Sequence, residues 1–204
     1  MMQAVERNKI HAQVVQLLGL ESLNGVRVAI VPTASERLVF RGFVARSIRY
    51  WEEWGADVTV IDLSSSASSV RDGLEQAQVI YVAGGNTYTL MRRLAQAGVK
   101  EYLPELLASR LYVGESAGSI VAGPNISTAI LTFDYNMEHA YTDRTGLGLA
   151  PFLLWPHYSA TSNTVMQLRE RLLPLVRRRA FSYGIERMRN GEVLLYRDGV
   201  TKRV

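Results

Sequence analysis

The sequence of 204 residues contains no cysteine and only three histidines. The lack of cysteine excludes a disulfide-stapled scaffold, a thiolate metal site and a cysteine nucleophile. Any catalytic chemistry must therefore use oxygen or imidazole groups. We expect a reducing compartment for the same reason.

Long hydrophobic runs are also absent. No apolar stretch reaches the roughly 18 residues that a membrane span requires, and the opening MMQAVERNKIHAQ lacks the apolar core of a signal peptide. The net charge of +4 is modest, and the basic run Arg177–Arg179 ends an amphipathic stretch, where cations oppose the helix dipole. We therefore expect a cytoplasmic protein that binds neither membrane nor nucleic acid, folded as a single domain over residues 1–204.

Short apolar strands alternate with helices along the first part of the chain. The pattern predicts strands at Val26–Val31, Val58–Ile61, Val79–Ala83 and Leu111–Val113, and helices at 5–19, Ser35–Trp54, Val70–Gln76, Thr87–Ala97 and Glu101–Ser109. Such alternation is typical of an α/β fold in which a mostly parallel sheet carries helices on both faces. The serine-rich segment Ser64–Ser69 is predicted to be a loop.

The second part of the chain is less regular. Polar residues over Asn125–Gly148 predict loops and short strands, Leu153–Tyr158 predicts a strand and Asn163–Val176 predicts a helix. Two hairpin signals, Asn190-Gly191 and Asp198-Gly199, predict a closing antiparallel meander.

Three of the predicted strands end in unusual residues. These are PTAS (Pro32–Ser35), GGNT (Gly84–Thr87) and GESAGS (Gly114–Ser119). Ligands bind at the carboxyl ends of parallel strands, so we expect the functional site there.

Ser116 stands in a G-x-S-x-G pattern between an apolar strand and a helix rich in small residues. This is the context of a nucleophile elbow, in which glycines permit a sharp turn that exposes the serine hydroxyl. The alternative is a glycine-rich turn around a buried serine.

A serine nucleophile needs a general base, and histidine is the usual one. His11 lies in the first helix and His139 in the polar segment, whereas His157 follows the predicted strand FLLW at the edge where Ser116 also lies. We therefore predict His157 as the base.

An oxyanion hole requires two backbone donors that face one point. Ala117 follows the nucleophile and can supply one, and Gly85 can supply the other from GGNT, with Asn86 beside it as a substrate-binding residue. The alternative for GGNT is a phosphate cradle, but neither G-x-G-x-x-G nor a following lysine is present.

Four sequence blocks together resemble the peptidase E family of serine peptidases, whose relatives include cyanophycinase. The blocks are YVAGGNTYTLMRRL, VGESAGSIVAG, GLGLAPFLLWPHY and SYGIERMRNGEVLLYRDG. The resemblance implies a three-layer α/β/α fold like that of class I glutamine amidotransferases. It also implies Ser116 as nucleophile, His157 as base, Gly85 and Ala117 as oxyanion donors, no metal, no cofactor, and a homo-oligomer, usually a dimer.

The third catalytic residue departs from the family pattern. The family usually carries an acidic residue shortly after a Gly-Ile or Gly-Leu pair, here Gly184-Ile185, and Glu186 comes one position early, with Arg187 at the usual place. Glu186 is our first choice. Asp134 is the second, and a neutral group that fixes the imidazole is the third.

Specificity departs from the family as well. Members that cleave dipeptides beginning with Asp carry an arginine in the loop after the catalytic histidine, but Ser159–Leu168 has no Arg or Lys and the first cation is Arg169. Arg92, Arg93 or a second subunit are the remaining sources of a cation. We expect a peptidase of short peptides without strong preference for Asp; a hydrolase of another acyl substrate and a non-catalytic binding protein are the alternatives.

Overall fold

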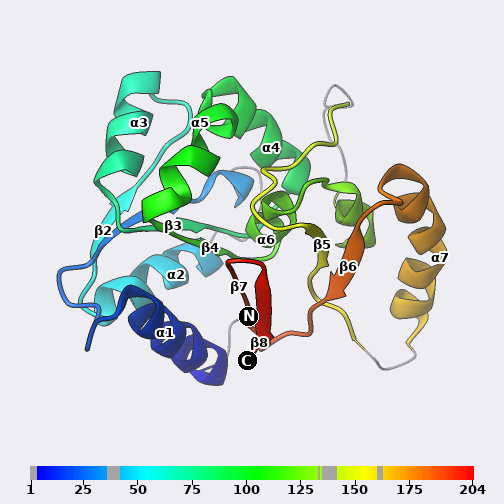
Figure 1. The fold of residues 1–204 in the computed structure, drawn as a ribbon, viewed down its shortest axis with the longest axis horizontal. Helices are drawn as coiled ribbons and strands as arrows, with labels where there is room; N and C mark the ends of the chain where they lie inside the picture. Colours follow the sequence, from blue (N-terminus) through cyan, green and yellow to red (C-terminus); the bar gives the residue numbers. More distant parts are fainter. Residues whose placement is uncertain (1–3, 36–41, 133, 135–141, 160–162) are drawn as a thin grey trace.

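The computed structural model describes residues 4–35, 42–132, 134, 142–159 and 163–204 (Figure 1). The helices are α1 (Ala4–Leu18), α2 (Gly42–Glu53), α3 (Ala67–Gln76), α4 (Thr87–Gln96), α5 (Val99–Leu106), α6 (Ala117–Ala122) and α7 (Thr164–Arg179), with short 3₁₀ turns η1 (Thr33–Ser35), η2 (Leu107–Ser109) and η3 (Ser127–Thr132). The strands are β1 (Arg27–Val31), β2 (Asp57–Val60), β3 (Val79–Val82), β4 (Leu111–Gly114), β5 (Phe152–Trp155), β6 (Gly184–Arg187), β7 (Leu194–Arg197) and β8 (Val200–Arg203).

Four strands form the central parallel sheet in the order β2-β1-β3-β4. The register places Ala29 of β1 between Thr59 of β2 and Ile80 of β3. Since β1, β3 and β4 are neighbours and run in the same direction, their carboxyl ends meet at one edge. PTAS, GGNT and GESAGS therefore lie together, as the sequence predicts.

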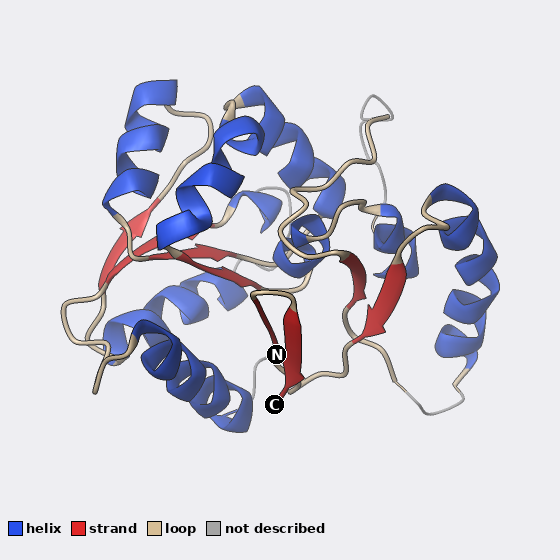
Figure 2. Ribbon diagram, in the orientation of Figure 1, coloured by secondary structure: helices blue, strands red, loops and turns tan. Residues whose placement is uncertain are grey.

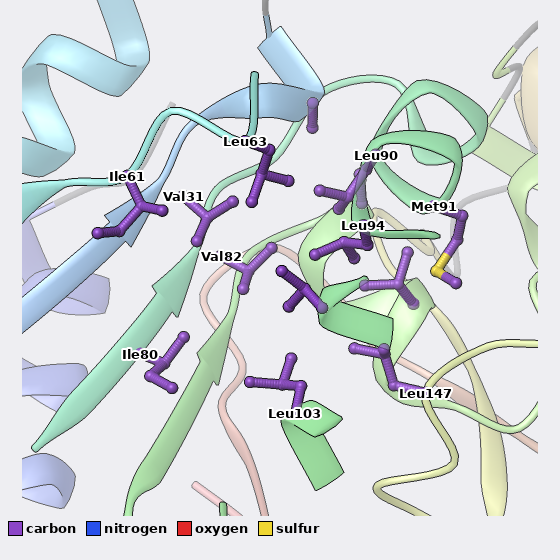
Figure 3. Close-up of a cluster of buried hydrophobic side chains, with 14 of the residues drawn as sticks. Val31, Ile61, Leu63, Ile80, Val82, Leu90, Met91, Leu94, Leu103 and Leu147 are labelled. Atoms are coloured by element: carbon purple, nitrogen blue, oxygen red, sulfur yellow. The ribbon is translucent and has the colours of Figure 1, made fainter. Parts of the chain in front are cut away.

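Helices cover both faces of this sheet (Figure 2). Alternate residues of β3 enter different cores: Tyr81 packs with Trp51 of α2 on one face, whereas Ile80 and Val82 pack under α3, α4 and α5 on the other (Figure 3). Each such side chain contributes about 1.5–3 kcal/mol when fully buried. The predicted mostly parallel α/β sheet with two helical layers is confirmed.

One helix boundary differs from the sequence prediction, and a second falls on residues that the structure does not describe. The helix start predicted at Ser35 stays a prediction: Thr33–Ser35 forms a 3₁₀ turn, residues 36–41 lie outside the described part, and α2 is described from Gly42 onward. The serine-rich segment Ser64–Ser69 is only partly a loop, because Ser66 Oγ accepts a hydrogen bond from Ser69 N–H and caps α3. A capping side chain thus extends the helix into a segment that composition alone predicts to be irregular.

The C-terminal region adds a parallel pair, β5-β6, and an antiparallel pair, β7-β8. Helix α7 packs on η3 around a third buried cluster that contains Trp155. The hairpin predicted at Asp198-Gly199 is confirmed, but Asn190-Gly191 joins β6 to β7 as a turn without hairpin pairing, because β6 pairs with β5 instead. No helix among the described residues is both long and apolar enough to cross a membrane.

Candidate active site

Ser116 occupies the sharp turn between β4 and α6. Its backbone angles are φ 50° and ψ −108°, a conformation that non-glycine residues rarely adopt and that costs on the order of 1–3 kcal/mol. Local hydrogen bonds hold it there: Gly118 N–H donates to Glu115 O at 2.8 Å, and Ser119 Oγ donates to Ser116 O at 2.6 Å. Ser116 is therefore held in the strained geometry of a nucleophile elbow.

The two glycines of the G-x-S-x-G motif are required by close packing. A Cβ atom at Gly118 would lie 2.1 Å from the carbonyl oxygen of Val82 on β3, and one at Gly114 would lie 2.6 Å from the carbonyl oxygen of Gly118. Any side chain at either position would push α6 away from the sheet. The two glycines are thus required for α6 to pack against the sheet, and this packing fixes the direction in which Ser116 projects.

His157 lies beyond the end of β5, and its Nε2 atom is 2.8 Å from Ser116 Oγ. The residue has a positive φ of 59°, and its neighbours hold this turn: Tyr158 N–H donates to Met188 O at 2.8 Å, and Arg169 Nη1 donates to His157 O at 3.1 Å. The structure therefore places the predicted base within hydrogen-bond distance of the predicted nucleophile.

Of the other two histidines, the structure describes only His11, which does not contribute to this arrangement. His11, on α1, packs against Trp54, and the centroids of the two rings are 5.2 Å apart. His139 lies outside the described residues.

The second ring nitrogen of His157 faces Asn190, with Nδ1 2.8 Å from Asn190 Oδ1. An amide oxygen can only accept a hydrogen bond, so Nδ1 carries the proton and the lone pair of Nε2 is directed at Ser116. Sequence reasoning left a neutral partner open but named no residue for it. The Asn190-Gly191 pair is a signal at this position, but the pattern predicts a turn and not a contact with the imidazole.

Neither carboxylate considered for this role contacts the imidazole. Glu186 Oε2 accepts from Arg203 Nη2 at 2.9 Å. In the parallel pair of β5 and β6, Glu186 stands in register with Leu154, three residues before His157. The first choice for the third residue is therefore corrected: the Glu186 carboxylate is bound by Arg203, whereas Asn190, on the turn after β6, contacts the imidazole.

Asp134, the second choice, follows η3 in the chain and contacts Thr87, the first residue of α4. Its Oδ2 accepts from the backbone N–H of Thr87 at 2.9 Å and from the Thr87 hydroxyl. Burial raises the pKa of Asp134, while the hydrogen bonds from Thr87 and the proximity of His157 act in the opposite direction. Asp134 thus lies near the site but anchors the start of a helix.

The predicted oxyanion donors belong to the two segments that meet at Ser116, since a Cβ atom at Gly84, the residue before Gly85, would lie 3.0 Å from Ser116 Cβ. Gly85 has φ 142°, which leaves its backbone in a conformation that favours glycine, and Ala117 is the first residue of α6. Within the described part of the chain, neither backbone N–H donates a hydrogen bond to another group. Asn86 caps α4, since its Oδ1 accepts from Thr89 N–H at 2.9 Å, and its contact with substrate stays a prediction.

Glu115, the residue before the nucleophile, is anchored by a hydrogen bond from Tyr81 of β3. The hydroxyl of Tyr81 donates to Glu115 Oε2, and Ser47 Oγ lies 3.1 Å from the same hydroxyl. Burial, together with the charge of Glu115, raises the pKa of Tyr81 well above its usual value. The Tyr81 hydroxyl therefore acts as the hydrogen-bond donor to the Glu115 carboxylate.

Replacing Tyr81 with phenylalanine is expected to lower the free energy of unfolding by about 1–3 kcal/mol, because the half-buried Glu115 carboxylate loses its donor. Urea denaturation followed by fluorescence measures this change. Tyr196→Phe is the matched control, since the ring of Tyr196 packs on Phe152 and its hydroxyl bonds to no other described group. Equal stability of the two variants would contradict the anchoring role.

Comparison with known proteins supports a peptidase. The model for peptidase family S51 matches residues 3–204. An uncharacterized peptidase of Pasteurella multocida is 31% identical over 134 residues, and a peptidase E of Shewanella amazonensis is 39% identical over 90 residues. The matches cover 65% and 44% of this chain, and the chain spans just under two thirds (65%) and 37% of those proteins.

Solved structures show the same fold. The crystal structure of a candidate peptidase E protein from Listeria monocytogenes superimposes with a TM-score of 0.79 at 25% identity, covering 100% of this chain and 95% of that one. This match confirms the fold like that of class I glutamine amidotransferases that the sequence blocks imply.

Proposed function

Because the chain belongs to peptidase family S51, we propose that it is a serine peptidase that cleaves short peptides through a covalent acyl-enzyme. One observation carries this proposal: Ser116 Oγ, exposed by the elbow, lies 2.8 Å from His157 Nε2. A nucleophile and a base within hydrogen-bond distance, with the base oriented by a third group, are the elements of a nucleophilic hydrolase.

In the first half-reaction, Ser116 Oγ attacks the carbonyl carbon of the scissile peptide while His157 Nε2 takes the hydroxyl proton. The C–N bond then breaks, His157 returns the proton to the leaving amine, and an ester on Ser116 remains. In the second half-reaction, water attacks the ester, His157 takes a proton from the water, and Ser116 regains its proton as the acid product leaves. The backbone N–H groups of Gly85 and Ala117 hold the oxyanion in both steps.

Asn190 acts as the orienting group in this mechanism. Its amide oxygen accepts from His157 Nδ1 and selects the tautomer in which Nε2 is a base. Unlike a carboxylate, an amide carries no charge, so it stabilises the imidazolium only by its dipole. We propose a Ser116–His157–Asn190 triad.

An elbow selects acyl transfer but not the acyl group, so substrate class requires an experiment. The purified protein is incubated with a panel of dipeptides, with short esters, and with neither. Release of free amino acids from dipeptides, lost in Ser116→Ala, supports the peptidase. Turnover of esters alone would indicate a hydrolase of another acyl substrate, and binding of dipeptides without turnover would overturn the enzyme proposal.

The protein is expected to release Asp from Asp-Leu no faster than it releases Ala from Ala-Leu. Recognition of the Asp side chain in a desolvated pocket needs a positioned cation, and an unpaired buried charge costs several kcal/mol, on the order of a thousandfold in binding. Arg169, the first cation after His157, already donates to the backbone of that residue. The measurement is kcat/KM for the two dipeptides at equal ionic strength.

Asn-Leu provides the matched control, because it has nearly the shape of Asp-Leu without the charge. We expect Asn-Leu to be cleaved as well as Ala-Leu or better. Efficient cleavage of Asp-Leu together with poor cleavage of Asn-Leu would show that a cation reaches the pocket, and the specificity proposal would then be wrong.

A further inference from the structure

Asn190 stands on a turn between β6 and β7 that hydrogen bonds hold closed. Arg189 N–H donates to Glu192 Oε2 at 2.8 Å, and Glu192 N–H donates back to Arg189 O at 3.2 Å. Lys9 Nζ, from α1, also lies 3.4 Å from Gly191 O. The position of the Asn190 amide therefore depends on how firmly this turn is held.

Arg203, on β8, contacts the turn and the strand before it. Its Nη1 donates to Glu192 Oε2 at 2.7 Å and to the carbonyl oxygen of Arg187 at 2.7 Å. Its Nη2 donates to Glu186 Oε2 at 2.9 Å. One guanidinium thus joins β8 to the last residues of β6 and to the residue two positions after Asn190.

These contacts differ from an ordinary surface ion pair. Arg197 and Asp198, on the same hairpin, pair at 3.3 Å with 71% and 87% of their side-chain surfaces exposed, whereas Arg203 and Glu192 are 40% and 25% exposed. An exposed single ion pair contributes about 0–1 kcal/mol to stability. An arginine whose planar guanidinium donates several hydrogen bonds also fixes the relative positions of the groups that it binds. Partial burial alone would raise the pKa of Glu192, but hydrogen bonds from Arg189 and Arg203 hold it below its usual value.

We propose that Arg203 is a positioning residue that, by fixing the turn through Glu192 and Arg187, presents Asn190 to His157. The proposal rests on the proposed function, in which Asn190 orients the base. It also assigns a role to Glu186, which binds the guanidinium of Arg203 instead of contacting the imidazole.

The test is a double-mutant cycle on kcat and KM. Arg203→Met is expected to lower kcat by between about tenfold and a hundredfold with KM changed less than about threefold, since a displaced orienting group impairs chemistry more than binding. Arg203→Met combined with Asn190→Leu is expected to be no slower than Asn190→Leu alone, because both changes remove the same interaction. Arg197→Met is the matched control and is expected to behave like the unmodified protein.

If the double variant lost kcat by the product of the two single losses, the substitutions would act independently and the proposal would be overturned. Equal kcat values for Arg203→Met and Arg197→Met would also overturn it. All assays are run well below the melting temperature of each variant, so that loss of folded protein does not enter kcat. Without Ser116-dependent turnover in the unmodified protein, the proposed function fails; the crystal structure of Arg203→Met then decides the positioning role alone. A retained 2.8 Å contact between His157 Nδ1 and Asn190 Oδ1 would contradict that role, and a displaced Asn190 would support it.

Discussion

Asn190→Leu is expected to lower kcat about a thousandfold while KM changes little. Leucine has nearly the volume of asparagine but accepts no hydrogen bond, so the imidazole of His157 loses the partner that fixes its tautomer. The lost interaction matters in the transition state, when the ring becomes charged. Steady-state kinetics on the best dipeptide of the panel measure both constants.

Asn190→Asp is the companion variant, because it keeps an acceptor oxygen at the same position. It is expected to retain most of kcat, and the acid limb of the kcat/KM profile is expected to move to higher pH, since a carboxylate favours the charged imidazole. Unchanged kcat in Asn190→Leu would show that Asn190 does not orient the base. An unmoved acid limb in Asn190→Asp would contradict the contact between the two side chains.

Ser116→Ala is expected to lower kcat about a millionfold, the largest effect of any single change in this chain. Without Oγ no ester can form, and only the oxyanion donors and substrate binding remain to assist direct attack by water. Single-turnover assays with excess protein over long incubations detect this residual rate. Contaminating peptidase is excluded by repeating the assay with independent preparations.

Ser182→Ala serves as the control for Ser116→Ala, since Ser182 is exposed after the end of α7. It is expected to leave kcat and KM unchanged. A loss of less than about tenfold in Ser116→Ala would assign the reaction to another nucleophile, because no nucleophilic serine is dispensable to that degree.

The sheet was predictable because its signal is local. Buried parallel strands such as Val79–Val82 are apolar throughout and are followed by helices, so strand positions and direction follow from a few residues at a time. Helix starts were less predictable. Composition did not reveal that Ser66 caps α3, or that Thr33–Ser35 would form a 3₁₀ turn.

The site residues also divide into those that the local sequence predicts and those that it does not. Ser116 and His157 each stand in a distinctive local sequence at a strand end, and the sheet brings those ends together. The local sequence does not identify the partner of His157: Asn190 is 33 residues away, and its Asn-Gly pair indicates a turn whatever the asparagine side chain contacts. An acidic residue next to Gly184-Ile185 pointed to Glu186, but the guanidinium of Arg203, a contact made by tertiary structure, occupies that carboxylate.

Mapping the covalent adduct of a fluorophosphonate probe tests the central claim most directly, since the probe reacts with a serine only when a base activates it. Digestion and mass spectrometry are expected to place one adduct on Ser116. Its formation is expected to be slower in Asn190→Leu and absent in Ser116→Ala. An unmodified Ser116 in folded protein, or an adduct on another residue, would contradict the account.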